Sequence, residues 1–250
     1  MNGLIKRLVF CLSLPVAALQ GLRLRRNAIR LPEASGARGG VSGQGKELHL
    51  LALGDSIIAG VGTGSMASSL PVQFAQALAG IRQCAVHWRV EGKNGADIAD
   101  LLQGMGRFSG DLKADVILIS IGVNDVTGLS SARQWRTRLE QLVSGIRNRW
   151  PQARVIFAGL PPMGCFPAPP QPLRFVLGHR AATLDAIAAG VISAQPGMLH
   201  IATHIDPHRD QFCADGFHPS ADSCAFWAAL LAQKFEADNV AGPVTGKGFA

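Results

Sequence analysis

Residues 48–53 form a mostly apolar run that ends abruptly at Gly54-Asp55-Ser56. A short strand of this composition is typical of the centre of a parallel sheet, where helices cover both faces. Four later segments also have strand patterns, and segments with helical spacing separate them. The strands are predicted at 84–91, 115–121, 153–158 and 198–205, and the helices at 70–79, 96–103, 131–150, 173–193 and 221–235. Strands that alternate with helices predict a three-layer α/β/α sandwich around a five-stranded parallel sheet.

The charge of the chain is concentrated at its amino-terminal end. Residues 1–46 contain eight lysines and arginines and a single acid, so this segment carries the whole net charge of +7. The rest of the chain is neutral and lacks the basic patch that binds phosphate backbones, so we expect no nucleic-acid partner. The length predicts one globular domain, over residues 47–236, followed by a tail at 237–250.

The first 30 residues combine an apolar run, Leu8 to Leu19, with basic residues on both sides. The run has about 12 residues, too few to span a bilayer. It fits a helix at the membrane surface with its arginines on anionic head groups. The alternative is a secretory signal with a cleavage site near Val16-Ala17-Ala18, which would make the protein periplasmic or secreted. The arginines that follow this run resist export, so membrane association is the preferred prediction. The side of the membrane is left open. Residues 31–46, rich in glycine, serine and alanine, are predicted to be a linker.

Polar residues follow three of the predicted strands, where each strand ends. Ser56 follows the first strand, Asn94-Gly95 the second and Asn124-Asp125 the third. Because the carboxyl ends of parallel strands meet at one edge of the sheet, open α/β sheets bind their ligands there. Backbone N–H groups of Ser56 and Gly95 and the side-chain amide of Asn124 would supply an oxyanion hole. Asp125 is interpreted as a helix cap and is left out of the catalytic set.

Asp215-Gly216-Phe217-His218-Pro219, just before the last predicted helix, supplies the partners that a nucleophilic serine needs. Such a serine requires a base within hydrogen-bond reach and a third group that holds the base. Asp215 and His218 can face the same way across the glycine turn. We therefore predict Ser56 as nucleophile, His218 as base and Asp215 as the acid that orients the imidazole.

Four blocks of this sequence resemble, in order and spacing, those of the SGNH (GDSL) hydrolases. They are Gly54-Asp55-Ser56, Gly95, Gly122-Val123-Asn124-Asp125 and Asp215-x-x-His218-Pro219, and the resemblance covers about residues 47–235. It implies a flavodoxin-like fold with strand order 2-1-3-4-5 and serine esterase activity. By position it assigns the same roles, with Ser56, His218 and Asp215 as the triad and Ser56, Gly95 and Asn124 as the oxyanion donors. Ile57 departs from the leucine that gives the family its older name, which affects no catalytic group.

The predicted function is hydrolysis of carboxylic esters, acyl or acetyl, through an acyl-enzyme. An acyltransferase using the same triad and a non-catalytic binding module on the same fold are the alternatives. The apolar, proline-rich loop 161–172 suggests a wall for an acyl chain, which tilts the substrate mildly toward lipid-like or aryl esters.

No cofactor or metal is expected. The glycines at 60–64 lack a following Lys-Ser/Thr, and the run His204-x-Asp206-x-His208-x-Asp210 is interpreted as a polar loop rather than a metal site. The five cysteines are predicted to be free thiols, with a Cys213–Cys224 disulfide left open.

Overall fold

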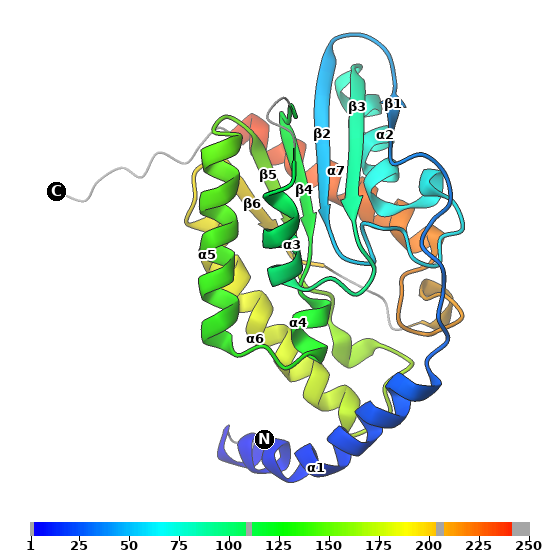
Figure 1. The fold of residues 1–250 in the computed structure, drawn as a ribbon, viewed down its shortest axis with the longest axis vertical. Helices are drawn as coiled ribbons and strands as arrows, with labels where there is room; N and C mark the ends of the chain where they lie inside the picture. The colour runs from blue at the N-terminus through cyan, green and yellow to red at the C-terminus, as the bar shows by residue number, and fades with distance from the viewer. Residues whose placement is uncertain (1–2, 109–111, 204–207, 242–250) are drawn as a thin grey trace, which may run out of the picture.

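The computed structural model describes residues 3–108, 112–203 and 208–241 (Figure 1). The strands are β1 (Gly39–Ser42), β2 (Glu47–Gly54), β3 (Ala85–Gly92), β4 (Val116–Ser120), β5 (Arg154–Ala158) and β6 (Met198–Ile201). The α-helices are α1 (Gly3–Asn27), α2 (Leu70–Arg82), α3 (Ile98–Met105), α4 (Val123–Thr127), α5 (Ala132–Arg149), α6 (Leu173–Ser193) and α7 (Ala221–Ala241). Short 3-10 helices are η1 (Met66–Ser68), η2 (Met163–Cys165) and η3 (Arg209–Gln211).

The sheet has the order β1-β3-β2-β4-β5-β6. The five strands from β3 to β6 are parallel to one another, which confirms the predicted order 2-1-3-4-5. The predicted strand count was one too low, because β1 pairs antiparallel with β3 and makes the sheet mixed and six-stranded. This strand lies inside the stretch predicted as a linker. With two glycines among four residues it has no strand pattern of its own, and it becomes a strand because the edge of β3 offers it hydrogen bonds.

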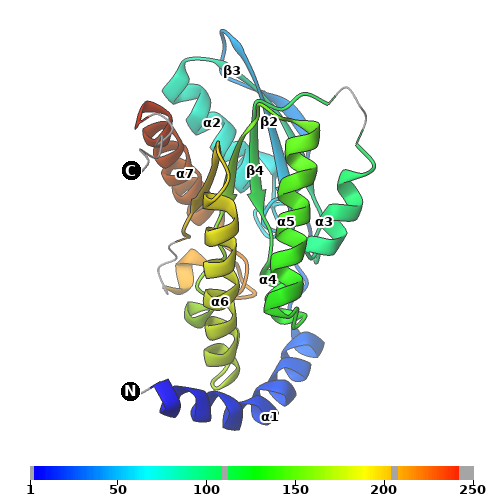
Figure 2. The same cartoon turned by 90° about the vertical axis from the view of Figure 1, so that its left-hand side faces the viewer.

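Helices cover both faces of the sheet, as the sequence predicted (Figure 2). Along β2 the side chains alternate, so that Leu51 and Leu53 pack in the core on the α3, α5 and α6 side. Leu50 and Ala52 pack in a second core formed with α2 and α7. All four residues are at most 1% exposed, because a central parallel strand is covered on both faces.

Helix α6 is the one helix in the described part of the chain that is long and apolar enough to cross a membrane, by length and composition only. Its residues Leu177, Leu184 and Ala188 are buried in the core, and the backbone carbonyl of Leu184 accepts a 2.9 Å hydrogen bond from the indole of Trp135 on α5. These contacts are those of a helix that covers the sheet of a globular domain.

Helix α1 packs across one end of α6, beyond the carboxyl ends of the strands (Figure 2). Phe10 contacts the rings of Phe175 and His179 on α6 edge-on, and the Gln20 side chain bonds to the backbone of Gln171 and Leu173. The segment that follows α1 then runs along the loops at this end of the sheet. The amino-terminal residues therefore lie at the same end of the molecule as the site described next.

Candidate active site

Strand β2 ends in a glycine because no other residue fits there. Gly54 has φ +156°, and a Cβ atom on it would lie 1.9 Å from the carbonyl oxygen of Ser120 on β4. The N–H of Asp55 donates to that same carbonyl at 3.1 Å, after which the chain turns away from the sheet. The turn leaves Ser56 at the carboxyl edge of the central strand, with only 6% of its surface exposed.

The loop that precedes α7 brings an imidazole and a carboxylate to this serine. Nε2 of His218 lies 3.0 Å from Oγ of Ser56, and Nδ1 of His218 lies 2.6 Å from Oδ2 of Asp215. The other carboxylate oxygen of Asp215 accepts hydrogen bonds from the backbone N–H groups of Phe217 and His218, each at 3.0 Å. Three side chains predicted from the sequence are thus joined by one chain of hydrogen bonds.

The surroundings of Asp215 favour its charged form. Burial by itself raises the pKa of this carboxyl, but the hydrogen bond with the His218 side chain and those from the two backbone N–H groups outweigh it, and the pKa lies below its ordinary value. An ionised carboxylate at Nδ1 keeps the proton of a neutral imidazole on that nitrogen. Nε2 is then a proton acceptor facing the serine hydroxyl.

The three predicted oxyanion donors lie at the same edge of the sheet, on the segments that directly follow β2, β3 and β4. Gly95 follows β3 in the left-handed region, at φ +79°, and Asn124 is in the first turn of α4. The Asn124 amide donates to the carbonyl of Ala96 at 2.9 Å, which ties α4 to the Gly95 loop. Within the described residues, the N–H groups of Ser56 and Gly95 have no hydrogen-bond acceptor, so both are available to a ligand.

Asp125 and Asp55, neither of them among the predicted site residues, are fully buried carboxylates at this edge of the sheet. Asp125 accepts hydrogen bonds from the N–H of Ile98, at the start of α3, and from the Ser130 hydroxyl, both at 3.0 Å. It therefore connects α4 to the start of α3. The prediction that Asp125 caps its own helix is wrong, because the N-cap of α4 is Gly122 and no side chain caps this helix. Burial raises the pKa of Asp125 to about 6. The sequence signal for Asp55 was its position directly after an apolar strand, while its burial and its partners come from the fold.

Asp55 directly precedes Ser56 and has one unsatisfied oxygen. Its Oδ1 accepts from the N–H of Ile57 at 3.0 Å, while Oδ2 is buried without a hydrogen-bond partner among the described residues. Burial raises the pKa of Asp55 to about 7, although the Ile57 N–H and nearby His218 favour the charged form.

We expect Asp55→Asn to remove a pH dependence of stability. The folded chain binds the Asp55 proton more tightly than the unfolded chain, so the free energy of unfolding falls as pH rises from 3.8 to about 7. Asparagine keeps the acceptor for Ile57 and does not ionise, so the variant gains stability relative to the parent across this range. Urea denaturation of both chains between pH 4 and pH 8 measures the difference, and two parallel stability curves would contradict the prediction.

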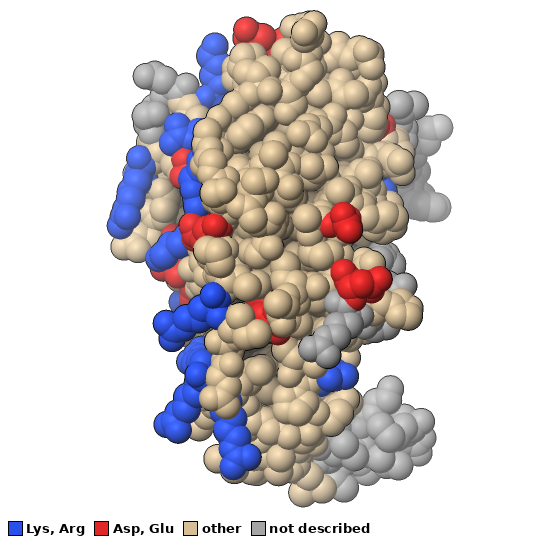
Figure 3. Space-filling model, turned by 90° about the vertical axis from the view of Figure 1, so that its right-hand side faces the viewer, with Lys and Arg blue, Asp and Glu red and all other residues tan. Residues whose placement is uncertain are grey.

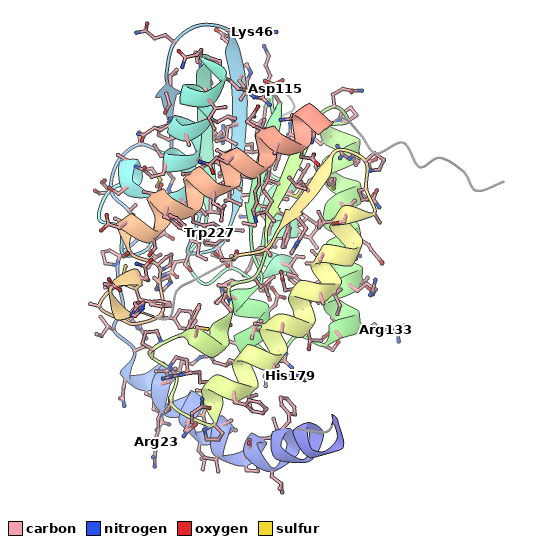
Figure 4. All side chains as sticks on the ribbon, turned by 180° about the vertical axis from the view of Figure 1, so that it is seen from behind. Arg23, Lys46, Asp115, Arg133, His179 and Trp227 are labelled. Atoms are coloured by element: carbon pink, nitrogen blue, oxygen red, sulfur yellow. The ribbon has the colours of Figure 1, made fainter. Side chains whose placement is uncertain are left out.

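A narrow, mostly apolar cavity adjoins Ser56 and His218. It is also lined by Ile57, Val123, Pro161, Phe166, Phe217, Pro219 and Trp227, the last on α7 (Figure 4). The proline-rich loop therefore contributes two residues to the cavity, Pro161 and Phe166. Phe166 is held by edge-on contacts with the rings of Phe212 and Phe217, at 5.2 and 5.1 Å between centroids.

Three other features were considered in the sequence as binding sites or cross-links: the glycines at 60–64, the His204-to-Asp210 run and the pair Cys213 and Cys224. Gly60, Gly62 and Gly64 all have positive φ and pack beside residues 31–35 rather than forming an open cradle. Residues 204–207 lie outside the described part of the chain, and with them most of the His204-to-Asp210 run. Among the described residues, no three His, Cys, Asp or Glu side chains are placed to hold a metal ion. Cys213 and Cys224 are free thiols.

Comparisons with known proteins identify the family of the chain. The model of the GDSL-like lipase/acylhydrolase family matches residues 52–226. A GDSL-like esterase of Mycobacterium tuberculosis is 31% identical over 195 residues, which cover 74% of this chain and 60% of the relative. The chain thus spans less than two thirds of that relative's length.

Solved structures share the fold at lower sequence identity. A lipase/acylhydrolase from Enterococcus faecalis has a TM-score of 0.60 at 22% identity, over 76% of this chain and 96% of the other. A carbohydrate acetylesterase from Sinorhizobium meliloti has a TM-score of 0.57 at 16% identity, over 76% and 99%. An extracellular lipase from Streptomyces rimosus has a TM-score of 0.56 at 17% identity, over 75% and 99%. The family model covers most of the domain built around the Ser56 edge of the sheet, and the chain belongs to the GDSL-like lipase/acylhydrolase family.

Proposed function

We propose that the protein is a serine hydrolase that cleaves carboxylic esters through an acyl-enzyme formed on Ser56. The observation that carries this proposal is the hydrogen-bonded chain from Asp215 through His218 to Ser56, beside N–H groups with no other acceptor in the described part of the structure. A nucleophile, a base, an orienting acid and free donors at one edge of the sheet are the components that acyl transfer requires. Family membership supports the same class of reaction.

In the first half-reaction, Ser56 Oγ forms a bond to the ester carbonyl carbon while His218 Nε2 takes the hydroxyl proton. The carbonyl electron pair moves onto its oxygen, which accepts hydrogen bonds from the N–H groups of Ser56 and Gly95 and from the Asn124 amide. The intermediate collapses, the bond to the alcohol oxygen breaks, and His218 gives its proton to that oxygen. Water then attacks the acyl-enzyme by the same steps and releases the acid and the free serine. Asp215 stabilises the imidazolium throughout.

The cavity beside Ser56 supports an ester with an apolar acyl group, since Ile57, Val123, Pro161 and Phe166 border it. Relatives in fold include proteins described as lipases and a protein described as a carbohydrate acetylesterase, so the acyl length is open to measurement. Hydrolysis of p-nitrophenyl esters from acetate to palmitate by the full chain tests the function. Absence of hydrolysis, together with no reaction of Ser56 with a fluorophosphonate, would favour a binding module instead. An acyltransferase would pass the acyl group to an added alcohol in preference to water.

We also propose that α1 brings the protein to an anionic membrane surface. Leu12, Leu19 and Leu22 on this helix are 59–70% exposed, although its other face packs on α6. Helix α1 contains no acidic residue, and Arg23, Arg25 and Arg26 are exposed near its end. Blue side chains run along one side of the lower half of Figure 3, and Arg23 extends away from the body in Figure 4. Exposed leucines with neighbouring arginines suit the interface of an anionic bilayer.

The alternative is export with removal of this segment. It would show as a shortened amino terminus of the mature protein.

The double variant Arg25→Gln/Arg26→Gln should bind phosphatidylglycerol vesicles about thirty-fold more weakly, since each arginine near such a surface contributes about 1 kcal/mol. Vesicle cosedimentation at low salt measures the change. The matched control is Arg133→Gln/Arg136→Gln, which removes two exposed charges from α5; Arg133 is labelled in Figure 4. Equal binding by the two double variants would contradict a role for α1.

A further inference from the structure

Two charged residues in the stretch predicted as a linker bond to the loop that carries Gly95. Oε1 of Glu33 accepts a 2.7 Å hydrogen bond from the N–H of Asn94. Oε2 of Glu33 lies 2.5 Å from Nη2 of Arg38, and Nη1 of the same guanidinium donates to the carbonyl of Gly92 at 2.7 Å. The Glu33–Arg38 pair thus contacts this loop at two points, on either side of Lys93. We call this arrangement the Glu33–Arg38 clamp.

The clamp contacts the half of the loop that α4 does not reach. On the far side of Gly95, Asn124 bonds to the carbonyl of Ala96 and Asp125 accepts from the N–H of Ile98. On the near side, the Glu33 carboxylate accepts from the N–H of Asn94, the residue that directly precedes Gly95. Gly95 has φ +79°, and a Cβ atom on it would meet nothing within 4 Å. The N–H of Ala96 donates to the carbonyl of Lys93 at 3.2 Å and closes the turn around Gly95. The hydrogen bonds to Glu33 and from Asn124 anchor this turn on its two sides and so help to orient the Asn94–Gly95 peptide.

The segment that carries Glu33 is itself fixed to the loop that follows Ser56. Ala34 N–H donates to the carbonyl of Ala59 at 3.1 Å, and Gly62 N–H donates to the carbonyl of Pro32 at 3.1 Å. Ser35 bonds to Gly64 through both its N–H and its hydroxyl. The segment that carries Glu33 is therefore fixed to the loop that follows Ser56. From this segment the Glu33 side chain reaches across to the Gly95 loop.

We infer that Glu33 and Arg38 are positioning residues of the oxyanion hole, which hold the Gly95 N–H toward the oxygen of the intermediate on Ser56. This inference rests on the proposed ester hydrolysis. Neither side chain lines the cavity beside Ser56 and His218, so both act through the loop. The amino-terminal segment then completes the active site, although the family model begins only at residue 52.

Glu33→Ala in the full chain should lower kcat for p-nitrophenyl acetate while KM stays within about two-fold. Complete removal of one oxyanion donor costs about 10²–10³ in kcat, and a misdirected donor loses part of that, so we expect a decrease of about ten-fold or more. Glu33→Gln keeps an acceptor for the Asn94 N–H and should retain activity within about three-fold. Glu91→Ala is the matched control and should keep the parental kcat. It breaks the 2.6 Å ion pair between Arg89 and Glu91 on β3, the strand before the Gly95 loop, and removes no hydrogen bond to that loop.

A trifluoromethyl ketone, which forms an oxyanion on the catalytic serine, separates positioning from a general loss of structure. Its Ki should rise in Glu33→Ala by the factor by which kcat/KM falls. Should Glu33→Ala fail to fold, Arg38→Ala decides, and a kcat reduced three-fold or more at unchanged KM supports the clamp.

The outcomes distinguish this inference from the function on which it rests. An active parent with kcat unchanged in Glu33→Ala overturns the clamp and leaves the proposed function standing. If the parent hydrolyses no ester, the rate at which a fluorophosphonate labels Ser56 replaces kcat, and equal rates in parent and variant overturn the clamp. A parent whose Ser56 is not labelled overturns both.

Discussion

Ser56→Ala is expected to lower kcat for ester hydrolysis by a factor of about 10⁴ or more. The hydroxyl that His218 contacts at 3.0 Å is the group that would form the covalent bond, and no other hydroxyl is within reach of this imidazole among the described residues. Alanine removes the nucleophile and leaves the N–H donors of the site in place, so residual substrate binding is expected. The variant should therefore show almost no turnover and an unchanged fold.

Single-turnover and steady-state assays with p-nitrophenyl acetate measure this loss, and mass spectrometry after fluorophosphonate treatment shows whether residue 56 is labelled. Ser65→Ala is the control, because this serine lies in the same stretch of loop and, among the described residues, its hydroxyl bonds only to that of Ser68. A Ser56→Ala chain that keeps its melting temperature and has a kcat within ten-fold of the parent would show that Ser56 is not the nucleophile.

Asp215→Asn should lower kcat by about 10⁴ with little change in KM. The carbonyl oxygen of asparagine can still accept from the N–H groups of Phe217 and His218. Its amide then faces Nδ1 of His218, where it donates a hydrogen bond, so the neutral imidazole must carry its proton on Nε2. An imidazole with Nε2–H pointing at Ser56 cannot accept the serine proton.

The control for this variant is Asp210→Asn, an exposed aspartate on η3 a few residues earlier. NMR of the imidazole nitrogens reports the tautomer directly, and kcat is measured on the same samples. An Asp215→Asn chain with the Nδ1–H tautomer and parental kcat would show that this carboxylate has no orienting role.

Sequence patterns predicted the elements of the central sheet because their causes are local. Residues 48–53, 115–121 and 153–158 are short apolar segments of the kind found in strands that are covered on both faces, and β2, β4 and β5 lie there. Ser56, Gly95 and Asn124 were predictable as neighbours for a related reason. Parallel strands end at one edge, so residues just after them meet there whatever lies between in the sequence.

Sequence patterns could not predict strand β1 or the roles of Asp55 and Asp125, because these depend on partners that are distant in the sequence. Gly39–Ser42 has no strand pattern, and its pairing with β3 decides its conformation. Asp125 looked like a helix cap until the fold placed the start of α3 against it. Asp55 is a turn residue by sequence and a fully buried group in the structure.

Residue patterns were thus enough to predict the layered α/β fold, its strand order through the family blocks, and the residues that gather at the Ser56 edge. Contacts in three dimensions were needed to show that residues 31–42 belong to the domain, as an edge strand and as the Glu33–Arg38 clamp. Apolar periodicity records which side chains are buried, and nothing more. A hydrogen bond between Glu33 and Asn94, 61 residues apart, leaves no periodic trace in the chain.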